Sequence, residues 1–243
     1  MAEENGAAPS KYDKDRLFQS SLITHASPSL KDELLSAGFI RKYDRNAFIF
    51  MDGYAIDHVF ILVSGFAKEY YSSATGQDFL RRVIYPGDCF SLQSIFSEHP
   101  HYTYSCTSVV QATCFLWPVD KFLKFINRDA SLGFQVAKIL SSHLEHSCRK
   151  NCICQKKESR SRVAAYLLGR CRTGNDMKDC TSSSSVREID LRPLELSASS
   201  ICLARETFSR ALSSLQEQGL IRSHRGMVEL IELEALKVIC GAS

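Results

Sequence analysis

Residues 201–231 read ICLARETFSRALSSLQEQGLIRSHRGMVELI, and this stretch decides the fold of the C-terminal part of the chain. Phe208, Leu212 and Leu215 recur at helical spacing, which predicts a helix with one apolar face. The helix should end at Gly219, because glycine is a common C-terminal stop. The segment IRSHRGMVELIEL then alternates like a β-hairpin, and LELSASSICL reads as a short preceding helix. This order of elements predicts a winged helix-turn-helix.

Charged and hydroxyl side chains gather near the start of the longer helix, at Arg205, Glu206, Ser209 and Arg210. In a helix-turn-helix the second helix enters the major groove, and its first turns reach base edges. Arginine donates to guanine O6 and N7, and glutamate accepts from cytosine N4. An ordinary solvated helix face is the alternative interpretation. The flanking helix and hairpin favour readout of a G·C pair.

Length and composition indicate an ordinary globular chain with two domains. The chain has 243 residues, and a prior of about 150 residues per domain suggests two. Charged residues make up 23% and hydrophobic ones 44%, which argues against disorder. The net charge of +3 hides a basic concentration over residues 149–172. The sequence therefore predicts a local basic patch and not a polybasic protein.

The sequence also predicts a cytoplasmic location. No apolar run approaches the roughly 18 residues of a membrane span, and the opening MAEENGAAPSKYDKD is polar and acidic, unlike a signal peptide. The ten cysteines are therefore expected to be reduced thiols by default. We expect no membrane partner.

Between residues 39 and 118 the texture is that of short strands, as in FIF, HVFILVSG and YTYSCTSVVQATCFLWP. Glycines in turn contexts recur about every eleven residues, at Gly53, Gly65, Gly76 and Gly87. The run from Val59 to Val63 is apolar throughout, as expected for a strand covered on both sides. These features predict a closed jelly roll.

Helical patterns flank the roll. A short helix is predicted over 29–38, a long one over 131–149, and another over 158–172, followed by an exposed loop over 173–186. The long helix should project an apolar seam. The helical pattern begins soon after Pro118, and its residues are Leu123, Ile126, Leu132, Val136, Ile139, Leu140 and Leu144. The expected boundary lies near residues 151–155.

With these elements the C-terminal stretch resembles the recognition helix of the CRP/FNR family of bacterial transcription regulators, in RETFSR followed by ALSSLQEQGLI. GYAIDHVFILVSGFAKEY, YPGDCFSLQSIF and the helix over 132–144 resemble that family's early roll strands, effector-pocket segment and dimerisation helix. The resemblance implies an α+β fold: a β-roll of the cyclic-nucleotide-binding type with an N-terminal extension over 1–118, a dimerisation helix over 119–152, and a winged helix-turn-helix over 153–243.

The resemblance also implies a function. Members bind double-stranded DNA as homodimers at a palindromic operator and recruit or obstruct RNA polymerase, so we expect no enzyme activity. By the same resemblance Arg205, Glu206 and Arg210 are base readers, and Thr207 and Ser209 contact phosphate or sugar. Two departures predict a slightly irregular unit: Cys202 stands where the family's turn has glycine, and Ser197 where it has an apolar residue.

The effector is expected not to be cyclic AMP. Family members that bind it carry a Glu after the PGD turn and an Arg further on, whereas this chain has PGDCFSLQ and Tyr104 there. A phosphodiester without a cationic partner would be poorly compensated. Another small molecule is the expected effector, although the same residues also suit plain β-roll core. The candidate pocket comprises Cys89, Phe90, Leu92, Tyr102, Tyr104 and Leu140.

A cluster in HLEHSCRKNCICQKK is a second candidate for control. Its members are His143, His146, Cys148, Cys152 and Cys154. Thiolates and imidazoles suit zinc, an iron-sulfur cluster or haem iron, and neighbouring Lys and Arg favour a reactive thiol. The spacing matches no standard closed metal site, so inert cysteines and a reversible thiol switch remain open alternatives. The two histidines also suit polar positions of a dimer seam.

Two other functions are alternatives to DNA binding. A jelly roll with His99 and His101 suits a cupin-like metalloenzyme if these residues share a strand, but Pro100 between them favours a turn. A β-roll signalling module that has lost DNA binding is the other. Neither accounts for the helix-turn-helix pattern.

Overall fold

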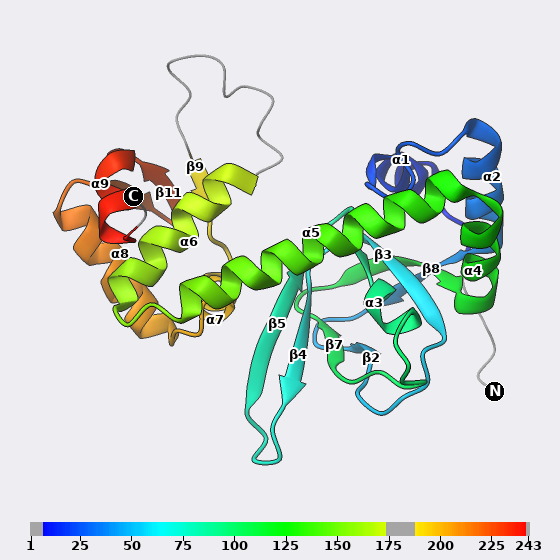
Figure 1. Ribbon diagram of the computed structural model, residues 1–243, viewed down its shortest axis with the longest axis horizontal. Helices are drawn as coiled ribbons and strands as arrows, with labels where there is room; N and C mark the ends of the chain where they lie inside the picture. The colour runs from blue at the N-terminus through cyan, green and yellow to red at the C-terminus, as the bar shows by residue number, and fades with distance from the viewer. Residues whose placement is uncertain (1–6, 174–187, 242–243) are drawn as a thin grey trace. The chain divides into compact units, whose positions relative to one another are not determined.

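The computed structural model describes residues 7–173 and 188–241 (Figure 1). The chain forms two compact units, Met1–Glu145 and His146–Ser243, which meet within one helix, α5 (Ala130–Cys154). The loop predicted over 173–186 lies outside the described residues, apart from Thr173.

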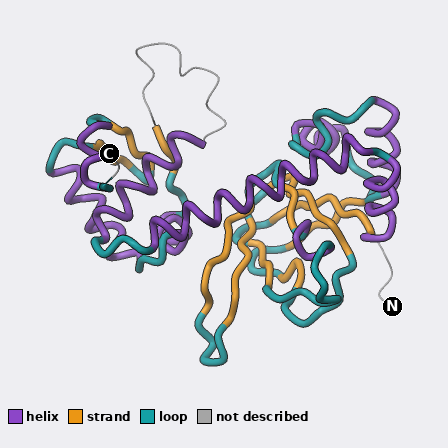
Figure 2. The backbone as a smooth tube through the Cα atoms, viewed as in Figure 1, coloured by secondary structure: helices purple, strands orange, loops and turns teal. Residues whose placement is uncertain are grey.

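The first unit is built on two antiparallel four-stranded sheets (Figure 2). One has the order β1 (Phe39–Tyr43), β8 (Ala112–Pro118), β3 (His58–Ser64) and β6 (Cys89–Phe90). The other has the order β2 (Phe48–Phe50), β7 (Ser105–Ser108), β4 (Ala67–Ser72) and β5 (Asp78–Ile84). This arrangement confirms the predicted β-roll.

Strand β3 is buried along its length because both faces of its sheet are covered. Phe60 and Leu62 face the second sheet, in a core with Phe50 and Phe90. Alternate residues on the opposite face, such as Ile61, join a second core with the helices. The apolar run that predicted a doubly covered strand is thus explained, since successive strand side chains point to opposite faces.

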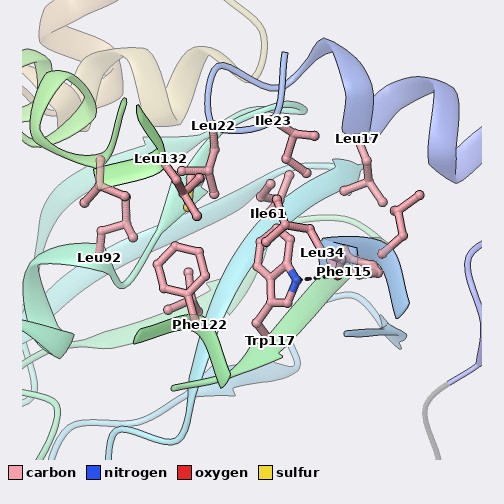
Figure 3. Close-up of a cluster of buried hydrophobic side chains, with 14 of the residues drawn as sticks. Leu17, Leu22, Ile23, Leu34, Ile61, Leu92, Phe115, Trp117, Phe122 and Leu132 are labelled. Carbon is pink, nitrogen blue, oxygen red and sulfur yellow. Dashed lines mark hydrogen bonds between the residues drawn. The ribbon is translucent and has the colours of Figure 1, made fainter. Parts of the chain in front are cut away.

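Helices cover the outer face of the β3 sheet. They are α1 (Lys11–Gln19), α2 (Pro28–Ala37), α4 (Val119–Arg128) and part of α5, while the short α3 (Leu92–Ile95) follows β6. Trp117 lies in this core with Phe115 and Phe122, and its Nε1 donates to the Leu34 carbonyl at 2.7 Å (Figure 3). The core therefore fixes α2 and α4 on the roll.

The segment predicted as one dimerisation helix over 119–152 is two helices. Asp129 interrupts it with extended backbone, φ −119° and ψ 100°, and its Oδ1 accepts from the Leu132 N–H at 2.9 Å. An aspartate in this role caps the start of a helix, so α5 begins anew at Ala130. Helix α5 also continues beyond the predicted end at 149, to Cys154.

The sequence predicts that the apolar residues of α5 form one outward seam. The structure shows that they do not. Leu132, Val136 and Ile139 are buried against the helix's own roll, because they complete the core that contains Trp117. Phe134 and Leu144, by contrast, are 61% and 66% exposed.

The second unit has its own core of helices around a small sheet. Its helices are α6 (Ser159–Thr173), α7 (Leu194–Ser200), α8 (Arg205–Glu217) and α9 (Leu233–Ile239). Its strands have the order β10 (Ile221–His224), β11 (Met227–Leu230) and β9 (Glu188–Asp190). The predicted helix, turn, helix and hairpin are all present, whereas α9, like α1 in the first unit, was not predicted.

Candidate functional site

Helix α8 presents the predicted base-reading side chains on its exposed face. The opposite face is buried at Phe208, Ala211, Leu212 and Leu215. The predicted readers lie as follows: Arg205, Glu206, Ser209 and Arg210 are exposed, and Thr207 is half-buried. Within the described part of the chain, no ion pair engages the two arginines or the glutamate. These charges are therefore available to an external partner.

The face that α8 buries is held by α6 and α7. Tyr166 of α6 packs edge-on against Phe208, with ring centroids 6.1 Å apart, and its hydroxyl lies 3.3 Å from Ser197 Oγ. Ser197 is buried and donates to the Leu191 carbonyl at 2.8 Å. A buried hydroxyl is tolerated when it is hydrogen-bonded. The serine expected to make the unit irregular is thus a satisfied part of its core.

The turn between α7 and α8 contains Cys202, whose φ of +57° lies in the left-handed region. Glycine adopts this conformation without cost, whereas other residues do so less often. Cys202 therefore replaces only the side chain of the glycine that the family has here, and the turn keeps the backbone conformation that glycine favours.

The hairpin of β10 and β11 is the wing of the unit. Its tip holds Arg225 and Gly226 with φ of 48° and 84°, typical of a type I′ turn. A Cβ at Gly226 would lie 2.6 Å from Arg192 Cγ, so space as well as conformation requires glycine there. His224 and Arg225 are exposed. Sequence reasoning found the hairpin but did not name Arg225 as a possible phosphate contact, although a basic turn residue signals one.

The first unit contains a small polar cavity of about 160 Å³. Arg81 of β5 lies over the Tyr104 ring, 4.4 Å from its centroid. Gln93 orients its carboxamide oxygen toward both, accepting from the Arg81 guanidinium at 2.8 and 2.9 Å and from the Tyr104 hydroxyl at 2.7 Å. The residues that line the cavity are Tyr71, Arg81, Gln93, Ser94, Ser97, His101, Thr103 and Tyr104.

Arg81 changes the electrostatic argument made from the sequence. A guanidinium does face this region, from β5 and not from the segment around Tyr104. Its charge is already paired, however, because Arg81 and Arg82 both form ion pairs with Glu69, whose side chain is fully buried. Burial lowers the pKa of Arg82, but the Glu69 and Asp88 carboxylates outweigh it and raise that pKa.

The six residues predicted to form one effector pocket are not brought together. Only Tyr104 lines the cavity. Tyr102 stacks on Phe50 at 4.0 Å between ring centroids. The six divide between two cores: Phe90, Tyr102 and Tyr104 lie between the sheets, and Cys89, Leu92 and Leu140 lie under the helices. For Cys89 and Phe90 of β6 the physical reason is strand alternation, which sends neighbouring side chains to opposite faces, whereas Leu92 and Leu140 belong to helices.

The predicted redox or metal residues are also separated. His143 Nε2 contacts the Arg82 guanidinium, His146, Cys148 and Cys152 are exposed, and Cys154 contacts Cys202. In residues 7–173 and 188–241 no three His, Cys, Asp or Glu side chains gather as a metal ion would need. Cys202 was missed as a partner, because only the fold brings it to Cys154.

The cupin-like alternative finds no support in the roll. His99 and His101 are exposed and lie in the loop after α3, outside any named strand. Two ligands on one strand, which that interpretation requires, are therefore not present at this pair. Separately, no helix within the described ranges is both long enough and apolar enough to span a bilayer.

Comparison with known families agrees with both units. Residues 40–129 match the family described as cyclic nucleotide-binding domain, and residues 161–239 match the Crp-like helix-turn-helix domain. Together these two matches cover most of the chain.

Individual proteins show the same relationship over most of the chain. The chain is 26% identical over 220 residues to the cyclic AMP receptor protein of Thermus thermophilus, covering 90% of this chain and 96% of that protein. It is 26% identical over 182 residues to the nitrogen fixation regulation protein FixK of Azorhizobium caulinodans, covering 74% and 69%. The structure of FixK2 from Bradyrhizobium japonicum shares the fold, with 20% identity, TM-score 0.68 and coverage of 85% and 98%.

Proposed function

Because the chain belongs to the CRP/FNR family of transcription regulators, we propose that it binds an inverted-repeat operator as a homodimer and reads it with α8. The observation that carries this proposal is the row Arg205, Glu206 and Arg210, exposed on a helix whose other face is buried. Two such helices related by a two-fold axis read half-sites about one DNA turn apart. The bound dimer then recruits or obstructs RNA polymerase.

The roles within α8 follow from donor and acceptor chemistry. Arg205 and Arg210 donate to guanine, Glu206 accepts from cytosine, and the hydroxyls of Thr207 and Ser209 contact phosphate or sugar. Arg225 at the wing tip adds a phosphate contact, since it is exposed and basic.

The proposed dimer surface is an exposed stripe on α5. Phe134, Ala137, Ser141 and Leu144 follow the alternating three- and four-residue spacing of a coiled-coil seam, and all four are exposed. We define these four residues as the outer stripe. The inner residues of α5, which are Leu132, Val136 and Ile139, pack against the helix's own roll. In this proposal α5 therefore contacts both its own roll and the partner helix.

The proposed control is by a small molecule other than a cyclic nucleotide, or by thiol chemistry. Ligand pockets usually enclose about 300–1,000 Å³. The cavity at Arg81 and Tyr104 is smaller, about 160 Å³, and the Arg81 charge is paired with Glu69. Both facts disfavour a cyclic nucleotide phosphate there.

Selection from random DNA duplexes tests the proposal. The reduced full-length chain should enrich an inverted repeat that contains a G·C pair in each half-site. Arg205→Ala should then weaken binding to that sequence by about 1–3 kcal/mol and relax the preference at one G·C pair per half-site. Fluorescence anisotropy at one fixed salt concentration measures both effects, because phosphate contacts make affinity salt-dependent.

Arg128→Ala is the matched control. Arg128 is an exposed arginine of α4 in the other unit, so its removal subtracts the same charge without touching α8. This variant should keep the sequence preference of the unmodified chain. Failure to enrich any inverted repeat, or an unchanged preference in Arg205→Ala, would contradict the proposal.

A further inference from the structure

Two thiols distant in the sequence meet beside the recognition helix. Cys154 is the last residue of α5, and Cys202 lies in the turn between α7 and α8. Their sulfur atoms are 3.3 Å apart, with the Cys154 thiol donating to the Cys202 sulfur. A disulfide requires about 2.05 Å, so the sulfurs need to approach by only about 1.3 Å.

The surroundings hold both segments in place. The Arg162 guanidinium donates to the Lys156 carbonyl at 2.6 Å and to the Cys202 carbonyl at 3.4 Å. It therefore links the chain just after Cys154 to the turn that carries Cys202. The two thiols face one another because the backbone on each side is tied to the same side chain.

The two cysteines differ in access. Cys202 is exposed, whereas Cys154 is half-buried. Burial, and then the neighbouring Cys202, raise the pKa of the Cys154 thiol to about 11. An oxidant in solution therefore reaches Cys202 first, and Cys154 is placed to react with the oxidised sulfur.

The position of Cys202 in the backbone connects the thiol pair to the start of the recognition helix. Its left-handed φ of +57° would suit glycine, yet the chain places a thiol there, three residues before Arg205. A covalent bond at this point would tie the end of α5 directly to the turn from which the recognition helix begins.

We propose that Cys154 and Cys202 form a reversible intramolecular disulfide that lowers operator affinity when the protein is oxidised. This inference rests on the proposed function. A peroxide converts the Cys202 thiol to a sulfenic acid and is itself reduced to water or an alcohol. The Cys154 sulfur then attacks the Cys202 sulfur, the S–S bond forms, and water leaves. A dithiol reverses the step and becomes a disulfide itself.

Lower affinity is the expected direction because operator binding places geometric demands on the junction. A dimer must present two recognition helices at the spacing of the half-sites. With free thiols, the end of α5 and the α7–α8 turn are linked only by non-covalent contacts such as those of Arg162, which break and re-form as the dimer adjusts to that spacing. With the bond in place they move as one, so the fraction of dimers that fit the operator falls.

The experiment uses the full-length chain with hydrogen peroxide as the oxidant. Peptide mass spectrometry under non-reducing conditions should find a Cys154–Cys202 linkage within one chain. Operator affinity, measured by anisotropy on the selected sequence, should fall at least tenfold and return with dithiothreitol. Cys154→Ser and Cys202→Gly should both abolish the response, the latter without backbone strain.

Cys148→Ser is the matched control. Cys148 is an exposed thiol of the same helix, α5, and it precedes Cys154 in the sequence without belonging to the proposed pair. This variant should respond to peroxide as the unmodified chain does. Linkage through Cys148 or Cys152 in place of the proposed pair would overturn the inference. So would the proposed linkage with unchanged or increased operator affinity.

The two proposals fail in different ways. If the reduced chain selects no operator, the proposed function is wrong, and the linkage analysis still reports whether the thiols join. If the reduced chain binds its operator but peroxide produces no linkage, only the disulfide is wrong.

Discussion

Glu69 is a carboxylate held inside the roll by two guanidinium groups. Its side chain has 0% exposure and pairs with Arg81 and Arg82 on the neighbouring strand β5. Arg82 in turn contacts His143 of α5. A buried charge is tolerated only while its partners remain, so the roll requires the ion pairs of Glu69 with Arg81 and Arg82. These ion pairs lie beside the contact between Arg82 and His143 of α5.

Replacing Glu69 with glutamine should destabilise the roll by on the order of 3 kcal/mol, because two largely buried arginines lose their counter-charge. Calorimetry of the full-length chain should show the transition of the first unit at a lower temperature. Glu33→Gln is the control, since Glu33 pairs with Arg128 at the surface. Exposed pairs contribute about 0–1 kcal/mol, so an equal loss in both variants would contradict this account.

At the scale of the elements, two glycines have opposite roles. Gly38 ends α2 with extended backbone, φ −119°, and a Cβ there would lie 2.5 Å from both the Phe115 ring and the Leu116 carbonyl. Gly133 lies within α5, where a Cβ would meet Ile126 at an ordinary 3.5 Å. The first glycine is required for close approach of helix and strand, and the second is not.

Alanine at the two positions should therefore change stability with opposite sign. Gly38→Ala should cost about 1–3 kcal/mol by overpacking the contact between α2 and β8. Gly133→Ala should stabilise by about 0.5–1 kcal/mol, because alanine favours the helix. Thermal unfolding of the two variants side by side measures this. A destabilising Gly133→Ala together with a neutral Gly38→Ala would contradict the roles assigned to the two glycines.

The elements also show what sequence reasoning can reach. Turn glycines and strand texture predicted the roll, because their spacing is a local property. Helix α1 was missed although Ser10 and Asp13 form a capping box, since only Leu17 in it is buried and no apolar stripe stands out. The side of α5 that meets the roll was not predictable, because apolar residues lie both on the side that is buried, such as Val136, and on the side that is exposed, such as Leu144. Arg81 reaches the cavity only through the pairing of β5.

For the whole molecule, the proposed dimer depends on the outer stripe. Leu144→Asp should place a charge in that seam and shift the protein to monomers at micromolar concentration, with loss of operator binding. Sedimentation measures the mass, and Arg205→Ala should remain dimeric while its preference at one G·C pair per half-site relaxes. Ser142→Asp, an exposed change on the same helix outside the stripe, is the control. A Leu144→Asp variant that stays dimeric would place the interface elsewhere.

Trp117 has a practical consequence that follows from its place in the fold. The chain contains one tryptophan, and that indole is buried among β8, α2 and α4, in the core that the inner residues of α5 complete. Its fluorescence therefore comes from a single environment and needs no label. A metabolite that loosens α5 from the roll would shift this emission toward longer wavelength, so candidate signals can be screened with the unmodified protein in a plate reader.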